Sequence, residues 1–318
     1  MFKYLIRRIV VSIPVLISVT IIIFALIELA PGDVADNFIN PEIGYSAETL
    51  EAIRERFGLG QPAPVRYLKW LGNAVQGDFG LTYVSGEPVL AAIGRRLGNT
   101  LLLMSTALLV GTIIGVSLGV FTALRQYSFW DLALTTLSFV GISMPAFITG
   151  ILGMYLFAIE WKIFPSGGMR PVQRDPTVWD TLHHLILPAG ILSLAYIATF
   201  MRYTRFSMLE VLHTDYVRTA RGKGLRERVV IWRHTLPNAL LPVITVIGLS
   251  LPSLVVGAVF IETIFSWPGM GTMYLDAVNS KDVPLIMGMN TVIAIVVLTA
   301  NLLTDLAYGM IDPRIRYD

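Results

Sequence analysis

Residues 100–124 have the sequence TLLLMSTALLVGTIIGVSLGVFTAL, which contains no charged side chain. A helix rises about 1.5 Å per residue, so about 20 apolar residues cross the hydrocarbon core of a bilayer. An uncharged run of this length exceeds what the core of an ordinary soluble domain requires. The stretch therefore predicts a transmembrane helix.

The rest of the chain repeats this pattern. Only 14% of the 318 residues are charged and 54% are hydrophobic, with a mean hydropathy of +0.67; soluble proteins carry about 25% charged residues. Besides residues 100–124, further apolar runs predict membrane helices over residues 1–30, 132–159, 185–203, 236–262 and 283–310. The sequence predicts an all-α, polytopic integral membrane protein with six transmembrane helices.

Basic residues set the expected orientation, because cytoplasmic loops are enriched in Lys and Arg. Residues 202–234 hold eight basic side chains against three acidic ones, which predicts a cytoplasmic location for this loop and for both termini. The segment 31–99 is then extracytoplasmic, since long loops cross regardless of their charge. The expected organisation is an N-terminal transmembrane helix (1–30), this segment (31–99) and a transmembrane domain (95–311) with a cytoplasmic loop (204–235).

The first 30 residues resemble a secretory signal, but their apolar run is longer than the 7–15 residues typical of one. We interpret them as a retained anchor. In the segment that follows, Ser46 is expected to cap one helix and Pro64 to lie in the first turn of another. Residues 77–86 are rich in turn formers. This segment is expected to be a lid over the membrane domain or a docking surface for an extracytoplasmic partner.

Three glycines, Gly111, Gly115 and Gly119, recur at four-residue spacing within one apolar segment. Small residues on one face of a helix allow another helix to approach closely. Packing within the chain is the expected role, and a subunit interface is the alternative.

The motifs of catalysis are missing from the sequence. There are no cysteines, and the nearest approach to a phosphate-binding loop, Gly222-Lys223, lacks the preceding glycine and the following Ser or Thr. His183 and His184 are expected in an outer loop, where they suit an interface better than a metal site. We therefore expect no catalytic residue, no metal ligand and no cofactor bound by this chain.

Three carboxylates lie within or beside apolar segments. Glu28 and Glu262 are expected at the outer ends of their helices, near water, in structural roles. Asp305 is expected about two turns inside the last helix. A proton relay would make the protein a secondary transporter, whereas a structural hydrogen bond is favoured because no intramembrane basic partner accompanies Asp305.

The loop DYVRTARGKGLRER (residues 215–228) and its flanks carry a specific resemblance. Arg218-Thr219-Ala220, Gly224 and His234-Thr235-Leu236-Pro237 follow the spacing E-A-A-x3-G-x9-I-x-L-P of permease subunits of type I ABC importers. Arg218-Thr219 stands in place of Glu-Ala, His234 in place of Ile, and Gly222 where Ala is common. Further matching stretches are RRIVVSIPVL, LAPGD, GNAVQGDFG, FIETIFSWPGMG and NLLTDLAYGMIDPRIRY. The chain is most similar to the first of two permease chains in the dipeptide, oligopeptide, glutathione and nickel branch.

The resemblance implies that short helices of this loop insert into a groove on a separate ATPase subunit. The coupling residues are then Asp215, Tyr216, Arg218, Thr219, Ala220, Lys223, Gly224, Leu225, Leu236 and Pro237. We expect Ala220 and Gly224 to form a small face that enters the groove. Binding of anionic lipids explains the basic charge equally well but does not explain the fixed spacing.

Between the last two apolar segments, Trp267-Pro268-Gly269-Met270-Gly271 favours a tight non-helical turn. Together with Glu262, the residues Trp267, Pro268, Gly269 and Gly271 are a candidate outer gate of the translocation pathway. The alternative is an ordinary loop.

These expectations combine into one function. The chain is expected to form half of the pathway of an ATP-driven importer of short peptides in the plasma or inner membrane of a bacterium or archaeon. Its expected partners are a second homologous permease chain, two ABC ATPase subunits that bind ATP and Mg, an extracytoplasmic binding protein and the lipid bilayer, but no nucleic acid. Nickel, opines or oligosaccharides are alternative cargoes, and a proton-coupled secondary transporter, a channel or a membrane assembly factor are alternative functions.

Overall fold

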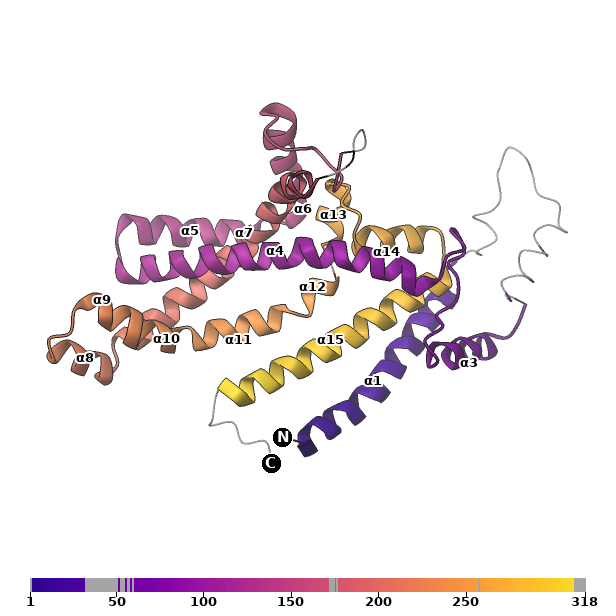
Figure 1. Ribbon diagram of the computed structural model, residues 1–318, viewed down its shortest axis with the longest axis horizontal. Helices are drawn as coiled ribbons and strands as arrows, with labels where there is room; N and C mark the ends of the chain where they lie inside the picture. The colour runs from indigo at the N-terminus through magenta and orange to yellow at the C-terminus, as the bar shows by residue number, and fades with distance from the viewer. Residues whose placement is uncertain are drawn as a thin grey trace. The chain divides into compact units, whose positions relative to one another are not determined.

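The computed structural model of the chain is built almost entirely from helices (Figure 1). It describes residues 2–31, 51, 55, 58, 60–171, 175, 177–256 and 258–311. Within these residues, the extended structure is one isolated bridge between Leu81 and Pro88. The predicted all-α class is therefore confirmed.

The helices follow one another in the order shown in Figure 1. Their bounds are α1 (Phe2–Leu29), α3 (Ala63–Ala74), α4 (Val89–Leu124), α5 (Phe129–Ser143), α6 (Ala146–Gly153), the π-helix η2 (Met154–Glu160), α7 (Val178–Leu212), α8 (Asp215–Gly222), α9 (Glu227–Val229), the π-helix η3 (Val230–Thr235), α10 (Leu236–Ala239), α11 (Leu241–Ser250), α12 (Ser253–Val256), α13 (Val259–Ile264), α14 (Met270–Asn279) and α15 (Val283–Ile311).

Four of these helices, α1, α4, α7 and α15, are long and apolar enough to cross a membrane. Two bent pairs, α5 with α6–η2 and α9–α10 with α11–α12, also pass this test when each pair is taken together. The described chain thus has four candidate spans, or up to six if each pair crosses once. It is a multi-pass membrane protein, and the six-helix count with both termini inside stays a prediction.

The predicted continuous helix over 132–159 is wrong. The chain bends by 103° between Phe129–Ser143 and Ala146–Glu160. Pro145 lies at the bend, and Met144 before it is extended (ψ 124°), the conformation that a following proline favours. The predicted helix 236–262 is likewise divided, into α10, α11, α12 and α13.

Two other helices are longer than the apolar runs that predicted them. Helix α7 extends to both sides of 185–203, and α4 begins at Val89 rather than near residue 100. A capping box starts α7: Thr177 Oγ1 accepts from the N–H of Asp180, and the Asp180 carboxylate accepts from the N–H of Thr177. His183 and His184 therefore lie on a helix, and their prediction as loop residues is wrong. An uncharged run identifies only the part of a helix that can lie in the hydrocarbon core, and the helix itself can continue beyond both ends of that run.

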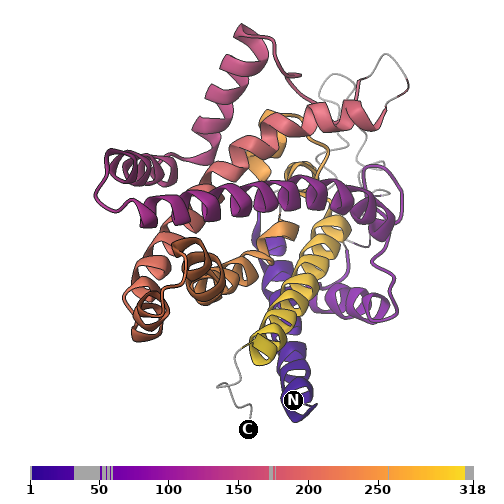
Figure 2. The ribbon, with the colours of Figure 1, turned by 60° about the vertical axis from the view of Figure 1, so that its left-hand side comes forward.

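The chain divides into two compact units, residues 1–98 with 269–318 and residues 99–268. In the first unit, α1 and α15 run side by side (Figures 1 and 2). Its buried core includes Phe79, Ile93, Met270 and Met289. Side chains of α1 and α15 pack in this same core, together with residues of the segment after α3 and of α14.

Helix α3 lies along the last turns of α1. The hydroxyls of Thr20 and Tyr67 are 2.9 Å apart, and Arg66 donates to both carboxylate oxygens of Glu28 at 2.5 Å. The prediction of Pro64 in the first turn of this helix is confirmed. Glu28 takes part in an ion pair, in agreement with its expected structural role. The helix predicted from Ser46 lies outside the described residues.

Asp282 fixes the turn-rich segment after α3 to the start of α15. Its carboxylate accepts from the N–H groups of Tyr83 (2.7 Å), Val84 (3.4 Å) and Leu285 (3.2 Å). Burial raises the pKa of Asp282 above its usual value, although the three N–H donors oppose that shift. Burial, with a smaller effect of the Asp282 charge, raises the pKa of Tyr83 to about 12. The turns predicted for 77–86 are confirmed by glycines of positive φ at both ends.

In the second unit, α4 packs against α7 along the glycine stripe. A Cβ at Gly111 would lie 2.3 Å from Tyr196 Cβ, and one at Gly119 would lie 2.6 Å from Thr204 Cβ. Real Cβ atoms do not approach that closely, so only glycine permits this packing. The predicted role of the stripe in packing within the chain is confirmed.

A buried ion pair joins α5 to α7. Arg205 donates to Asp131 through Nε (2.6 Å) and Nη2 (2.8 Å), and the N–H of Tyr127 adds a bond of 3.0 Å. Asp131 is only 3% exposed, so its charge requires these partners. No pattern in the sequence analysis predicted this ion pair. The sequence features that could have indicated it are Asp131, three residues after the helix-capping Ser128, and Arg205 in the basic stretch 202–234.

Candidate functional site

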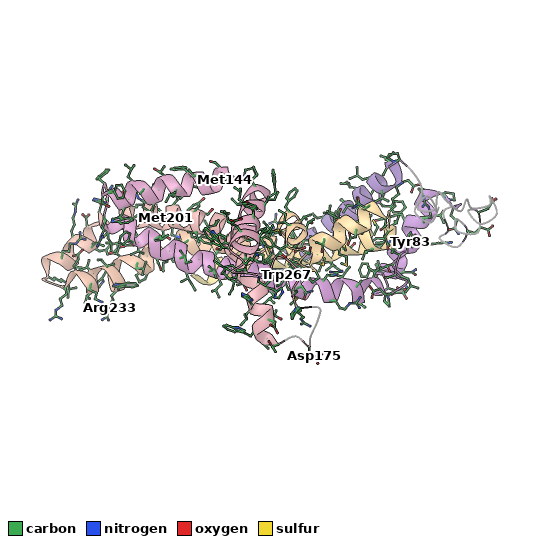
Figure 3. All side chains as sticks on the ribbon, turned by 90° about the horizontal axis from the view of Figure 1, so that it is seen from above. Tyr83, Met144, Asp175, Met201, Arg233 and Trp267 are labelled. Atoms are coloured by element: carbon green, nitrogen blue, oxygen red, sulfur yellow. The ribbon has the colours of Figure 1, made fainter. Side chains whose placement is uncertain are left out.

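The polar stretch 213–239 folds into a helical hairpin, which we call the coupling hairpin: α8, a turn at Gly224, then α9, η3 and α10. Its first helix begins after Thr214, which has an extended backbone, and Asp215 occupies the first turn. An acidic residue there is favourable because the N-terminal end of a helix carries partial positive charge. The second half carries basic residues, among them Arg233, which is labelled in Figure 3.

The turn of the hairpin is a Schellman motif. The N–H of Leu225 bonds to the carbonyl of Ala220 (3.4 Å), and the N–H of Gly224 bonds to that of Arg221 (2.9 Å). Gly224 has a φ of +76°, the left-handed conformation that this motif requires and that glycine adopts most easily. The spacing from Ala220 to Gly224 therefore corresponds to positions C3 and C′ of a helix end.

An ion pair closes the same turn. Arg221 on α8 donates to Glu227 on α9, at 2.7 Å from Nη2 and 3.2 Å from Nε. Both side chains are exposed, so the pair adds little stability but fixes the direction in which the chain leaves the turn.

The buried face of the hairpin contains Val217, Ala220 and Val230, with Val211 of α7 packed against them. Ala220 is 7% exposed. The expectation that Ala220 and Gly224 form a small face open to a partner is therefore wrong. Ala220 is small because it contacts this chain's own core. Gly224 has no neighbour within 4 Å of a Cβ added to it, so it is needed for its conformation and not for its volume.

The outer face is exposed and mixed in character. Three large side chains, Tyr216, Leu225 and Trp232, are 46%, 41% and 60% exposed. Arg218, Thr219 and Lys223 are exposed beside them. Aromatic residues and arginine are enriched at protein interfaces. Most of the residues predicted for coupling, including Asp215 and Pro237, are thus available to a partner.

The hairpin is anchored at its second end by Leu236. This side chain is buried with Val120 and Ala123 of α4 and Met208 of α7. The π-helix η3 leads into it, with Thr235 Oγ1 bonded to the carbonyl of Val230 at 3.1 Å. Short π-helical segments are frequent at functional sites. Leu236, predicted as part of the coupling surface, instead attaches that surface to the membrane helices.

The candidate outer gate is divided between the two units. Within the second unit, Glu262 is fully buried, and Thr100 donates a 2.8 Å hydrogen bond to its carboxylate. The indole N–H of Trp267 donates to the carbonyl of Asn99 (3.0 Å), and the Asn99 amide donates to the carbonyl of Pro268 (2.8 Å). Trp267 is fully buried and packs against Leu103 and Leu185, and Figure 3 shows its label well away from that of Arg233.

This network corrects two expectations. Glu262 is enclosed by protein, so its predicted position near water is wrong. The non-helical turn covers Ser266, which has a φ of +47°, to Gly269, whereas Gly271 lies within α14. Two part-buried hydrogen bonds, donated by Asn99 and Trp267, hold this turn, and its role as a gate stays a prediction.

The predicted structural role of Asp305 stays a prediction. Asp305 is on the helical backbone of α15, but its side chain lies outside what the structure describes. No group of three or more His, Asp or Glu residues in the described part of the chain is arranged to hold a metal ion.

Comparison with known proteins identifies relatives over the full length. The profile of the family described as binding-protein-dependent transport system inner membrane component matches residues 115–317, and that of the N-terminal part of such components matches residues 1–104. A permease protein of Brucella suis biovar 1 is 47% identical, over 99% of both chains. The oligopeptide transport system permease protein AppB of Bacillus subtilis is 44% identical and the dipeptide transport system permease protein DppB of Alkalihalophilus pseudofirmus is 37% identical, each over 100% of both chains.

A solved structure shares the fold. A chain of the MetNI methionine ABC transporter, in an inward-facing conformation, matches with a TM-score of 0.56 at 15% identity. The match covers 70% of this chain and 97% of that chain. About 70% of this chain therefore shares the fold of that transporter chain.

Proposed function

Because the chain belongs to the inner membrane component family of binding-protein-dependent transport systems, we propose that it is one permease subunit of an ATP-driven importer of short peptides. The observation that carries this proposal is full-length similarity to permeases named for oligopeptide and dipeptide transport. The chain forms half of the translocation pathway and pairs with a second, homologous permease chain. Peptide reaches it from an extracytoplasmic binding protein.

The coupling hairpin is the surface that we assign to an ATPase subunit. It presents Tyr216, Leu225 and Trp232 next to basic side chains, and its own Schellman turn and buried face hold it rigid. A rigid element transmits displacement without first deforming. ATP and Mg bind the ATPase subunits, and this chain performs no hydrolysis. We place the hairpin in the cytoplasm of a bacterial or archaeal cell, with six spans and both termini inside.

The test uses the complete transporter in proteoliposomes. We expect peptide to stimulate ATP hydrolysis and ATP to drive uptake of labelled peptide. Tyr216→Ala should weaken ATPase association at least about fivefold, as truncation of an interface anchor costs more than about 1 kcal/mol. Tyr155→Ala is the matched control, since Tyr155 on η2 is 51% exposed but lies outside the hairpin.

Other outcomes identify other functions. Uptake that needs no ATPase and stops when the proton gradient collapses would establish a secondary transporter. ATP-driven uptake of nickel, an opine or an oligosaccharide in place of peptide would keep the architecture and correct the cargo. Equal coupling in the Tyr216 and Tyr155 variants would contradict the assignment of the coupling surface.

A further inference from the structure

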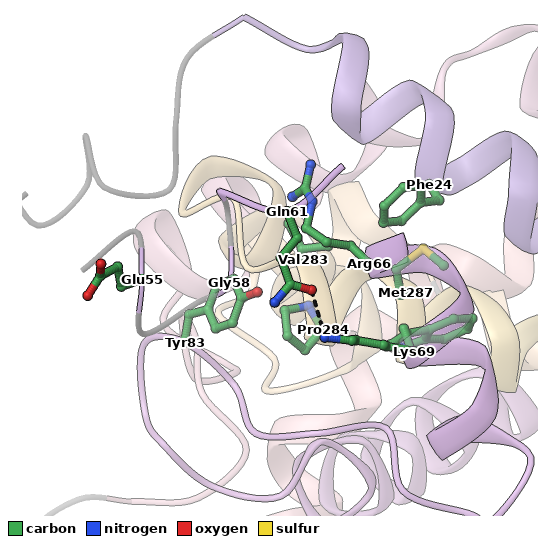
Figure 4. A pocket seen from close by; sticks show the side chains of 11 residues that line it. Phe24, Glu55, Gly58, Gln61, Arg66, Lys69, Tyr83, Val283, Pro284 and Met287 are labelled. Carbon is green, nitrogen blue, oxygen red and sulfur yellow. Dashed lines mark hydrogen bonds between the residues drawn. The ribbon is translucent and has the colours of Figure 1, made fainter. Parts of the chain in front are cut away.

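A pocket of about 300 Å³ lies in the first unit, where α1, α3 and α15 meet (Figure 4). Its lining includes Phe24, Arg66, Lys69, Trp70, Val283 and Met287. One wall is apolar and the other carries two cationic side chains. None of the coupling or gate residues belongs to it.

The pocket is at the level where two candidate spans end. Phe24 precedes the end of α1 at Leu29 by five residues, which is about 7.5 Å along the helix axis. Val283 is the first residue of α15. This depth corresponds to the boundary between the hydrocarbon core and the headgroups.

Helix α3, which carries the cations, has the character of an interfacial helix. Its apolar residues Val65 and Leu68 are 40% and 64% exposed. Such a helix places apolar side chains in the headgroup region of a bilayer. Trp70 and Tyr67 on the same helix are of the residue types enriched at that boundary.

The polar atoms of the lining are mostly donors. Arg66 Nε and Trp70 Nε1 are buried and have no hydrogen-bond partner in the described part of the chain. Lys69 donates to the Gln61 amide oxygen at 2.7 Å and forms no ion pair with a described residue. The Arg66 charge is balanced by Glu28. A ligand that fits must therefore accept hydrogen bonds and carry negative charge for Lys69.

Glu55 is the acidic side chain in the lining. It is exposed, and in Figure 4 its carboxylate points away from Lys69. It therefore leaves the cationic wall accessible to an anion.

We propose that this pocket binds the headgroup of an anionic phospholipid. A phosphodiester offers only acceptors and a negative charge, which suits the exposed ammonium of Lys69. The glycerol and first acyl carbons would contact Phe24 and Met287. The lipid would hold α3 against the ends of α1 and α15.

Native mass spectrometry of the detergent-purified chain, titrated with phosphatidylglycerol or phosphatidylcholine, tests this. We expect the wild type to retain phosphatidylglycerol preferentially. Lys69→Gln should weaken that retention about fivefold, the effect of one interfacial charge, and Lys69→Arg should preserve it. Lys162→Gln is the control, because Lys162 is exposed but lies in the other unit.

Three results would overturn the proposal. Equal retention of the two lipids would show that charge is not recognised, and equal effects of Lys69→Gln and Lys162→Gln would place the lipid elsewhere. Displacement of phosphatidylglycerol by inorganic phosphate would make the pocket a site for soluble phosphate. If Lys69→Gln does not fold, loss of the preference in the folded Lys69→Arg protein would also contradict the proposal.

Discussion

Gly222 and Gly224 allow conformation to be separated from volume in the coupling hairpin. Both are exposed, and a Cβ at either position would have no neighbour within 4 Å. Gly222 is the last residue of α8, whereas Gly224 follows the helix with a φ of +76°. The same substitution, Gly to Ala, therefore adds the same methyl group to two different backbone conformations.

The expected effects have opposite signs. Ala at position 224 must adopt a left-handed conformation, at a cost of about 1–2 kcal/mol. Ala at position 222 favours the helix by up to about 1 kcal/mol. Asn tolerates the left-handed region better than other non-glycine residues, so Gly224→Asn should fall between Gly224→Ala and the wild type.

Hydrogen exchange measures this directly, because the amides of residues 224 and 225 form the Schellman bonds. In Gly224→Ala, the Leu225 amide should exchange about 5–30 times faster, as expected from 1–2 kcal/mol of local stability. In Gly222→Ala it should exchange no faster than in the wild type. ATPase co-purification and peptide-stimulated hydrolysis in vesicles should rank the variants in the same order.

One pattern of results would contradict this role of Gly224. If Gly224→Ala and Gly224→Asn kept slow exchange at Leu225 but both lost ATPase binding, a partner would be contacting position 224 itself. Volume at the interface, and not the left-handed turn, would then be the reason for this glycine.

Three further predictions concern other parts of the chain. Gly115→Ala should lower the free energy of unfolding of the detergent-solubilised protein by about 1–3 kcal/mol, because the added methyl group overpacks the contact with α7. Gly98→Ala on the same helix should not, because the space around Gly98 is open. Equal changes in the two variants would contradict the glycine-stripe packing. Burial raises the pKa of Asp282 above 3.8, so the folded state favours the protonated carboxyl group. The free energy of unfolding of the wild type, relative to that of Asp282→Asn, should therefore fall as pH rises from about 4 through the folded-state pKa. A relative stability that increases with pH would contradict this prediction. In this cysteine-free chain, an impermeant thiol reagent applied to intact cells should label Ser85→Cys and spare Thr219→Cys, and the reverse labelling would overturn the orientation.

The sequence predicted the features that depend on apolarity and on local turn chemistry. Uncharged runs located α1, α4, α7 and α15, because burial in lipid excludes charge over a whole span. Pro64 and the glycines of 77–86 marked a helix start and turns, since proline fixes φ and glycine adopts positive φ. The glycine stripe predicted close packing because its four-residue spacing places all three residues on one face.

Other features depend on contacts that no local pattern encodes. The apolar run 132–159 contains no charge, so its hydropathy gave no sign of the 103° bend before Pro145. Glu262 ends an apolar run, which suggested water, but Thr100 and the surrounding side chains enclose it. Ala220 and Gly224 were predicted to form a small face open to a partner. That prediction was wrong because the sequence does not tell which side of a short helix is covered by the rest of its own chain.

The coupling hairpin is attached at both ends to the membrane helices of its unit. Only two residues separate the end of α7 at Leu212 from the start of α8 at Asp215. Leu236 joins the other end of the hairpin to α4 and α7, and the glycine stripe holds those two helices at a separation that tolerates no Cβ. Arg205 adds α5 through its bidentate bond to Asp131, whose burial makes separation costly. We therefore expect a force applied to α8 to move α4, α5 and α7 together.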